Sequence, residues 1–122
     1  MPEPFELYLI RHAIAEERGD KWPDDDKRPL SLEGTARMRK AANGLVRAGV
    51  ALDVVLTSPL VRARQTAEIV AGAFTPRPPI VTADPLAPGG SYAGVLAELE
   101  KQGRRRRLAL VGHEPDLGDL AA

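Results

Sequence analysis

The chemistry-bearing residues that stand out first are His12 and His113, the only two histidines in the chain. Near neutral pH an imidazole can act as a base, a metal ligand or a nucleophile. Each histidine follows a short apolar run, residues 5–10 (FELYLI) and 108–111 (LALV), with one residue between. Such runs predict strands buried on both faces, and open parallel sheets bind ligands at the carboxyl ends of their strands. We therefore predict that both histidines lie in one site.

An arginine near a predicted helix start indicates which ligand that site takes. Ser58 and a following proline come after the apolar run 51–57 and predict a helix start, with Ser58 as its cap. A cation such as Arg62 in the first turns of a helix interacts unfavourably with the helix dipole, at a cost of up to about 1 kcal/mol. An anion bound between Arg62 and the free N–H groups of the helix start offsets this cost. Arg64 falls on another face, which we expect to be exposed. Arg62 and the histidines therefore predict a phosphate-transfer site.

The elements that must position these residues alternate between strand and helix. Strands are predicted at 5–10, 51–57, 80–82 and 108–111, with intervening helices capped by Ser31, Ser58 and Ser91 and a last helix starting near residue 115. This order predicts an α/β fold of three layers, α/β/α, with a mostly parallel central sheet. We expect one domain over residues 1–122. The last helix stops after about two turns, so we expect the domain to be C-terminally short and to lack the C-terminal strands.

The composition excludes several classes of protein and site. Seventeen basic residues balance seventeen acidic ones, so neither nucleic acid nor an anionic membrane is an expected partner. The absence of cysteine excludes thiolate catalysis and cysteine-bound metals. No signal peptide and no apolar run of roughly 20 residues is present, which favours a cytoplasmic protein. The acidic run 24–26 is expected to be a solvated loop, neither histidine has a partner at metal-ligand spacing, and no metal is expected.

Four motifs together resemble those of the histidine phosphatase superfamily, also called the phosphoglycerate mutase-like superfamily. Residues 11–13 (RHA) resemble its first-histidine motif, and residues 112–115 (GHEP) resemble its second-histidine motif. Residues 28–34 (RPLSLEG) and 58–67 (SPLVRARQTA) resemble segments of its small SixA-like branch. Each motif is weak alone, but the ordered set covers nearly the whole chain. The resemblance implies the phosphoglycerate mutase-like fold.

The same resemblance implies roles for individual residues. His12 would attack phosphorus and become a phosphohistidine, while Arg11, Arg62 and His113 would bind the phosphoryl oxygens. Arg28 lies in a matching segment and is a candidate for substrate binding. Water would then release phosphate, with no metal or organic cofactor.

The acid that protonates the leaving group is the least defined part of this site. Many members of the superfamily place a carboxylate near this chain's residues 82–90, where Asp84 is the only carboxylate. Asp84 is therefore the candidate acid, although Pro85 corresponds to the position of the acid in the superfamily.

The weak match for an acid bears on the substrate. An alkoxide leaving group needs a proton, and a positioned acid contributes about 10²–10⁴ in rate, whereas a phosphohistidine has a labile P–N bond. A chain of 122 residues also has no room for insertions that enclose sugar phosphates. We therefore predict a phosphatase acting on protein phosphohistidine. The alternatives are a small-molecule phosphomonoesterase of the same superfamily and a non-catalytic phosphoprotein-binding module, which would not need His12.

Overall fold

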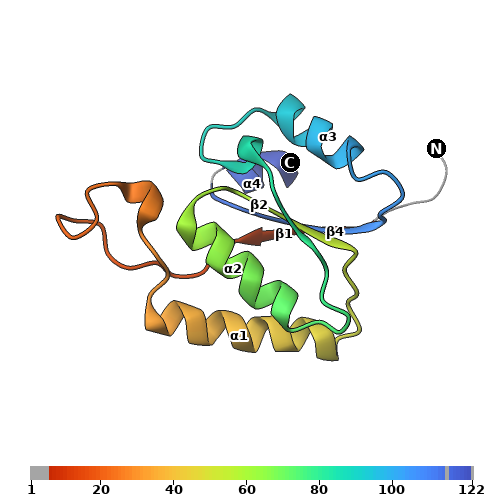
Figure 1. Ribbon diagram of the computed structural model, residues 1–122, viewed down its shortest axis with the longest axis horizontal. Helices are drawn as coiled ribbons and strands as arrows, with labels where there is room; N and C mark the ends of the chain where they lie inside the picture. The colour runs from red at the N-terminus through yellow and green to blue at the C-terminus, as the bar shows by residue number, and fades with distance from the viewer. Residues whose placement is uncertain (1–5, 115, 122) are drawn as a thin grey trace.

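The core of the protein is a four-stranded parallel sheet (Figure 1). The computed structural model describes residues 6–114 and 116–121. The strands lie in the order β1-β4-β2-β3, and every neighbouring pair is parallel. Their bounds are β1 Glu6–Arg11, β2 Val54–Thr57, β3 Ile80–Thr82 and β4 Arg107–Gly112. Parallel strands cannot be joined by tight hairpins, so each connection crosses over the sheet through a helix.

Helices cover both faces of this sheet. Figure 1 shows α1 and α2 on one side of the strands and α3 and α4 on the other. Their bounds are α1 Leu32–Arg47, α2 Val61–Gly72, α3 Tyr92–Glu100 and α4 Asp116–Ala121, with two single-turn 3-10 helices, η1 Asp25–Lys27 and η2 Asp84–Leu86. The predicted three-layer α/β/α architecture is confirmed. Among the described residues, no helix is long and apolar enough to span a membrane.

Alternate residues of the central strands pack against opposite layers. Val54 and Leu56 join the buried cluster on the α3 side, whereas Val55 packs with Ala109 on the α2 side. The α2 face of that second cluster is made of the alanines Ala63, Ala67 and Ala71. Small side chains allow the helix to lie close to the sheet. Because both faces are covered, the strands are continuous apolar runs rather than alternating ones.

The start of α1 is capped as predicted and also touches the segment that follows β1. The Ser31 hydroxyl oxygen accepts a hydrogen bond from the Gly34 N–H at 2.9 Å. A Cβ atom at Gly34 would lie 2.0 Å from the main-chain oxygen of Ile14. Glycine is therefore required where residues 12–31, the β1–α1 loop, cross the first turn of α1.

The predicted start of α2 was wrong by a few residues. The helix begins at Val61, and its N-cap, Leu60, is extended and makes no side-chain cap hydrogen bond. The Ser58 N–H donates to the Val111 oxygen at 2.9 Å, which extends the β2–β4 pairing by one residue. Ser58 therefore follows β2 directly and does not cap the helix; its hydroxyl oxygen instead accepts a hydrogen bond from the Leu60 N–H at 3.2 Å.

Candidate active site

The two histidines lie side by side at the carboxyl ends of adjacent strands. Arg11 pairs with Gly112 in the β1–β4 register, and the His12 N–H donates to the Gly112 oxygen at 3.0 Å. The ring centroids of His12 and His113 are 5.0 Å apart. The predicted proximity of the two side chains is confirmed, and it results directly from the parallel pairing of β1 with β4.

Both histidines line one open cleft of about 710 Å³. The predicted substrate-binding residues Arg11, Arg28 and Arg62 line it too. The remaining lining residues are Ala13, Ile14, Ala15, Arg18, Met38, Pro88 and Glu114. Five of the six residues singled out from the sequence are thus brought together, although nothing in this geometry tests the role of each.

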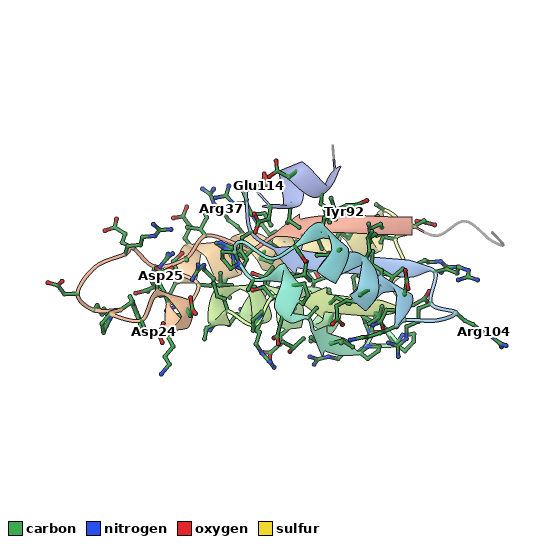
Figure 2. All side chains as sticks on the ribbon, turned by 90° about the horizontal axis from the view of Figure 1, so that it is seen from above. Asp24, Asp25, Arg37, Tyr92, Arg104 and Glu114 are labelled. Carbon is green, nitrogen blue, oxygen red and sulfur yellow. The ribbon has the colours of Figure 1, made fainter. Side chains whose placement is uncertain are left out.

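The candidate acid, Asp84, is not among the residues that line this cleft. It is exposed and begins the short helix η2. Glu114 does line the cleft, and it stands beside α4 in Figure 2. Its Oε1 atom accepts a hydrogen bond from the Gly118 N–H at 2.8 Å. The sequence signal for Glu114 is its position directly after His113, within the second-histidine motif.

The orientation of the His12 ring defines which nitrogen can react. Its Nδ1 atom lies 2.7 Å from the main-chain oxygen of Ala13. A carbonyl oxygen only accepts hydrogen bonds, so Nδ1 carries the hydrogen and donates it. The other nitrogen, Nε2, therefore keeps a free lone pair in the neutral ring. His12 is in the tautomer that a nucleophile attacking through Nε2 requires.

A threonine of α2 holds the backbone that orients His12. The Ala13 N–H donates to the Thr66 hydroxyl oxygen at 3.0 Å. That hydroxyl in turn donates to the main-chain oxygen of Arg62 at 2.8 Å. Thr66 is fully buried, so water cannot replace these bonds. One side chain thereby couples the residue after His12 to the first turn of α2.

Burial and neighbouring charges keep His12 neutral. Burial lowers the pKa of His12 below its ordinary value of 6.5, and the positive charges of Arg62, Arg11 and Arg28 lower it further. The hydrogen bond to the Ala13 oxygen opposes this shift by stabilising the protonated ring. The net effect favours the unprotonated form, which is the one able to attack phosphorus.

His113 is more buried and is also neutral. His113 is only 4% exposed, and its Nε2 atom lies 2.8 Å from the Ser58 hydroxyl oxygen. Burial, aided by the charge of Arg62 and by the repulsion that a protonated His12 would exert, lowers the pKa of His113 to about 4. In the free cleft His113 is therefore a hydrogen-bonding group rather than a cation.

Arg62 is buried, and one of its three nitrogens has no hydrogen-bond partner among the described residues. Its Nη1 atom donates to the main-chain oxygen of Asp25 at 2.8 Å, and Nη2 donates to the Asp25 carboxylate at 3.2 Å. Its Nε atom is buried without a hydrogen-bond partner among the described residues. A buried N–H left unpaired costs about 1–3 kcal/mol. An anion in the cleft could accept this hydrogen bond.

The acidic run 24–26 is not simply a solvated loop, as the sequence suggested. Asp25 accepts a hydrogen bond from the buried Arg28 at 2.8 Å, and this bond holds the pKa of Asp25 below its usual value. Arg28 also donates to the Glu16 oxygen at 2.7 Å. Figure 2 shows Asp25 in the β1–α1 loop. The correction concerns Asp25 alone, and its spacing of three residues from Arg28 was the available signal.

The described residues contain no group of three side chains that could hold a metal ion. What the cleft offers instead is a neutral imidazole with a free lone pair, a second neutral imidazole and four arginines. Cationic donors around a nucleophile suit the transfer of a phosphoryl group, whose charge lies on its equatorial oxygens.

Comparison with known proteins agrees with this chemistry. Residues 7–102 match the model of the histidine phosphatase superfamily, branch 1. The chain belongs to this superfamily. An uncharacterized protein of Picosynechococcus sp. (strain ATCC 27264 / PCC 7002 / PR-6) is 45% identical over 120 residues, covering 96% of this chain and 71% of that protein.

Solved structures of SixA proteins have the same fold as this chain. The protein histidine phosphatase SixA complexed with tungstate aligns with a TM-score of 0.84 and 29% identity, over 95% of this chain and 74% of that one. A protein assigned as the phosphohistidine phosphatase SixA of Agrobacterium tumefaciens aligns with a TM-score of 0.85 and 27% identity, over 98% of this chain and 75% of that one. This histidine phosphatase is therefore a SixA-like hydrolase, as its four motifs predicted.

Proposed function

We propose that this histidine phosphatase removes phosphoryl groups from phosphohistidine on proteins, through a covalent intermediate on its own His12. The observation that carries the proposal is the state of His12. Its Nδ1–H is used by the Ala13 oxygen, so its Nε2 lone pair is free. Arg62 lines the same cleft, and its buried Nε has no partner among the described residues. A nucleophile and an unsatisfied anion donor in one cleft fit phosphoryl transfer.

The reaction has two displacements at phosphorus. In the first, the Nε2 lone pair of His12 forms a bond to phosphorus as the P–N bond of the substrate breaks. The departing imidazole keeps that electron pair and takes a proton from water. In the second, water attacks phosphorus, the bond to Nε2 breaks and returns its electron pair to Nε2, and inorganic phosphate leaves. The proton that the attacking water loses neutralises the hydroxide formed in the first step. Arg11, Arg62 and His113 bind the equatorial oxygens in both steps.

Two features favour phosphohistidine over an ester. An imidazole is a better leaving group than an alkoxide, and the predicted acid Asp84 does not line the cleft. The chain is also 29% and 27% identical to two SixA proteins, one of which was solved with the phosphate-like oxyanion tungstate. An open cleft of about 710 Å³ can admit a side chain carried on a protein.

The carboxyl group of Glu114 supports a second candidate function. Because Glu114 lines the cleft, it could protonate the leaving oxygen of a small phosphomonoester. The two functions therefore differ in whether turnover depends on this side chain. A Glu114→Gln variant separates them, since glutamine keeps the size and hydrogen bonding of glutamate but carries no transferable proton.

A substrate panel tests the proposed function. We expect kcat/KM for a phosphohistidine peptide to exceed that for p-nitrophenyl phosphate and for sugar phosphates by at least about tenfold, and to be unchanged in Glu114→Gln. Faster turnover of a sugar phosphate that Glu114→Gln abolishes would instead support the phosphomonoesterase. Tight binding of the phosphohistidine peptide without turnover would leave a binding module as the remaining function.

A further inference from the structure

One carboxylate outside the cleft contacts three arginines that line it. Asp25 accepts from Arg28 at 2.8 Å and from Arg62 at 3.2 Å, and Arg18 lies 3.8 Å from the same carboxylate. Its main-chain oxygen also accepts from Arg62 at 2.8 Å. Asp25 itself is not among the residues that line the cleft. It is therefore linked to a bound ligand by contacts only through these arginines.

The contacts to Arg62 determine how its guanidinium is turned. A guanidinium is planar and rigid, so fixing two of its nitrogens fixes the direction of the third. Asp25 binds both terminal nitrogens, one through its main chain and one through its side chain. The buried Nε is the nitrogen that remains without a partner among the described residues. The contacts with Asp25 thus leave the Nε edge of the Arg62 guanidinium available to donate a hydrogen bond to a ligand.

The same carboxylate offsets repulsion among the arginines. Arg28 and Arg62 are both buried, with 7% and 4% exposure, and both reach Asp25. Like charges this close repel strongly when they are shielded from water. Without the carboxylate, Arg62 would turn away from Arg28 rather than keep its present direction.

We propose that Asp25 is a positioning residue of the phosphate site, which holds Arg62 so that its Nε–H donates to the bound phosphoryl group. This inference rests on the proposed function, because it requires the cleft to bind a phosphoryl group. Asp25 touches no reacting atom, and its effect passes entirely through the direction of the Arg62 guanidinium.

The effect of Asp25→Asn on anion binding distinguishes a positioning role of Asp25 from a purely electrostatic effect of its charge. Replacing Asp25 by asparagine removes a negative charge from the neighbourhood of the cleft. By Coulomb attraction alone, this change tightens the binding of an anion. If Asp25 positions Arg62, the same change weakens anion binding, because the guanidinium loses its orientation. The two explanations therefore predict opposite results.

The experiment measures tungstate binding by calorimetry for Asp25→Asn and for the matched control Asp26→Asn. Asp26 is an exposed neighbour, so the control makes the same charge change one residue away. We expect the Kd of tungstate to rise by about tenfold in Asp25→Asn and to change less than about twofold in the control. An unchanged or lower Kd in Asp25→Asn would overturn the proposal.

Two further measurements guard against a purely structural explanation. The longer side chain in Asp25→Glu keeps the charge but shifts its position, so we expect weaker tungstate binding at an unchanged net charge. The NMR signal of the Arg62 Nε–H should shift when tungstate binds the wild type and should not do so in Asp25→Asn. A shift of equal size in both would overturn the proposal even if the variant is less stable.

The failure of this inference can be told apart from the failure of the proposed function. Tungstate binding needs no turnover, so a wild type that binds tungstate but hydrolyses no phosphohistidine peptide contradicts the proposed function alone. A wild type that hydrolyses the peptide, together with an equally competent Asp25→Asn variant, contradicts the positioning role alone.

Discussion

At the scale of single residues, the chemistry of His12 depends on one contact with its own backbone. The hydrogen bond from Nδ1 to the Ala13 oxygen selects the tautomer, and burial together with arginine charges lowers the pKa so that the ring is neutral. The RHA motif supplies Arg11 and Ala13, but the motif alone determines neither effect. Both depend on where the chain turns after β1, and that turn is held by Thr66 of α2.

We expect Thr66→Val to impair both stability and activity. Valine has nearly the same shape but cannot accept the hydrogen bond from the Ala13 N–H, and this loss costs about 1–3 kcal/mol of unfolding free energy. The Ala13 oxygen then no longer holds the His12 ring, so kcat should fall. Urea unfolding and steady-state kinetics measure the two effects. Thr66→Ser, which keeps the hydroxyl, should retain most of the activity, and equal losses in both variants would contradict this role.

At the scale of elements, the β1–α1 loop contacts both α1 and α2, the two helices on its side of the sheet. Gly34 of α1 contacts the Ile14 oxygen, Thr66 of α2 binds Ala13, and Arg62 of α2 binds Asp25. These contacts make the loop a wall of the cleft rather than a free connection.

Two glycines of α1 should respond in opposite ways to replacement by alanine. Helix propensity favours alanine by about 0.5–1 kcal/mol at either position. At Gly34 the new Cβ would lie 2.0 Å from the Ile14 oxygen, whereas at Gly44 it would meet no atom within 4 Å. We expect Gly34→Ala to lower the melting temperature and the activity, and Gly44→Ala to raise the melting temperature. Thermal unfolding measures both, and a stabilised Gly34→Ala would show that the loop is not in contact with α1.

The element boundaries show what local sequence can and cannot predict. Ser31 and Ser91 cap α1 and α3 as expected, because capping depends only on residues within one turn. Arg64 is exposed as expected, since its face follows from helix periodicity. Ser58 has the same local pattern as a cap, yet its N–H pairs with Val111 of another strand. A contact so distant in sequence cannot be read from the neighbours of Ser58.

At the scale of the whole molecule, the parallel sheet brings the separate sequence motifs together in one cleft. The alternation of apolar runs and helices predicted this sheet, and the parallel pairing then placed His12 beside His113. The supporting contacts were not predictable. Thr66 lies 53 residues from Ala13, and Asp25 lies 37 residues from Arg62. Their partners are defined only by how the layers pack.

The buried, neutral His113 should make folding sensitive to acid. The pKa of His113 has its ordinary value of 6.5 in the unfolded chain and is about 4 in the folded protein. Between these two pH values the unfolded chain therefore binds more protons than the folded protein. The contribution of His113 to the free energy of unfolding is therefore fully present above pH 6.5 and is lost as the pH decreases toward 4. The loss is about 3 kcal/mol, because each unit of pKa difference corresponds to about 1.4 kcal/mol. Urea unfolding of wild type and His113→Gln at pH 7 and pH 4.5 measures this contribution. We expect the variant to lose less stability, and parallel losses would contradict a neutral buried His113.

The central claim is that His12 carries the phosphoryl group during turnover, and trapping the phosphoenzyme tests it most directly. The protein is mixed with a radiolabelled phosphohistidine peptide and quenched within one turnover under alkaline denaturing conditions, which preserve phosphohistidine. We predict a label that is stable to alkali, lost in acid, located on His12 by peptide mapping, absent in His12→Ala and still on His12 in His113→Gln. Hydrolysis of the peptide with no trapped label, or a label that persists in His12→Ala, would contradict the account.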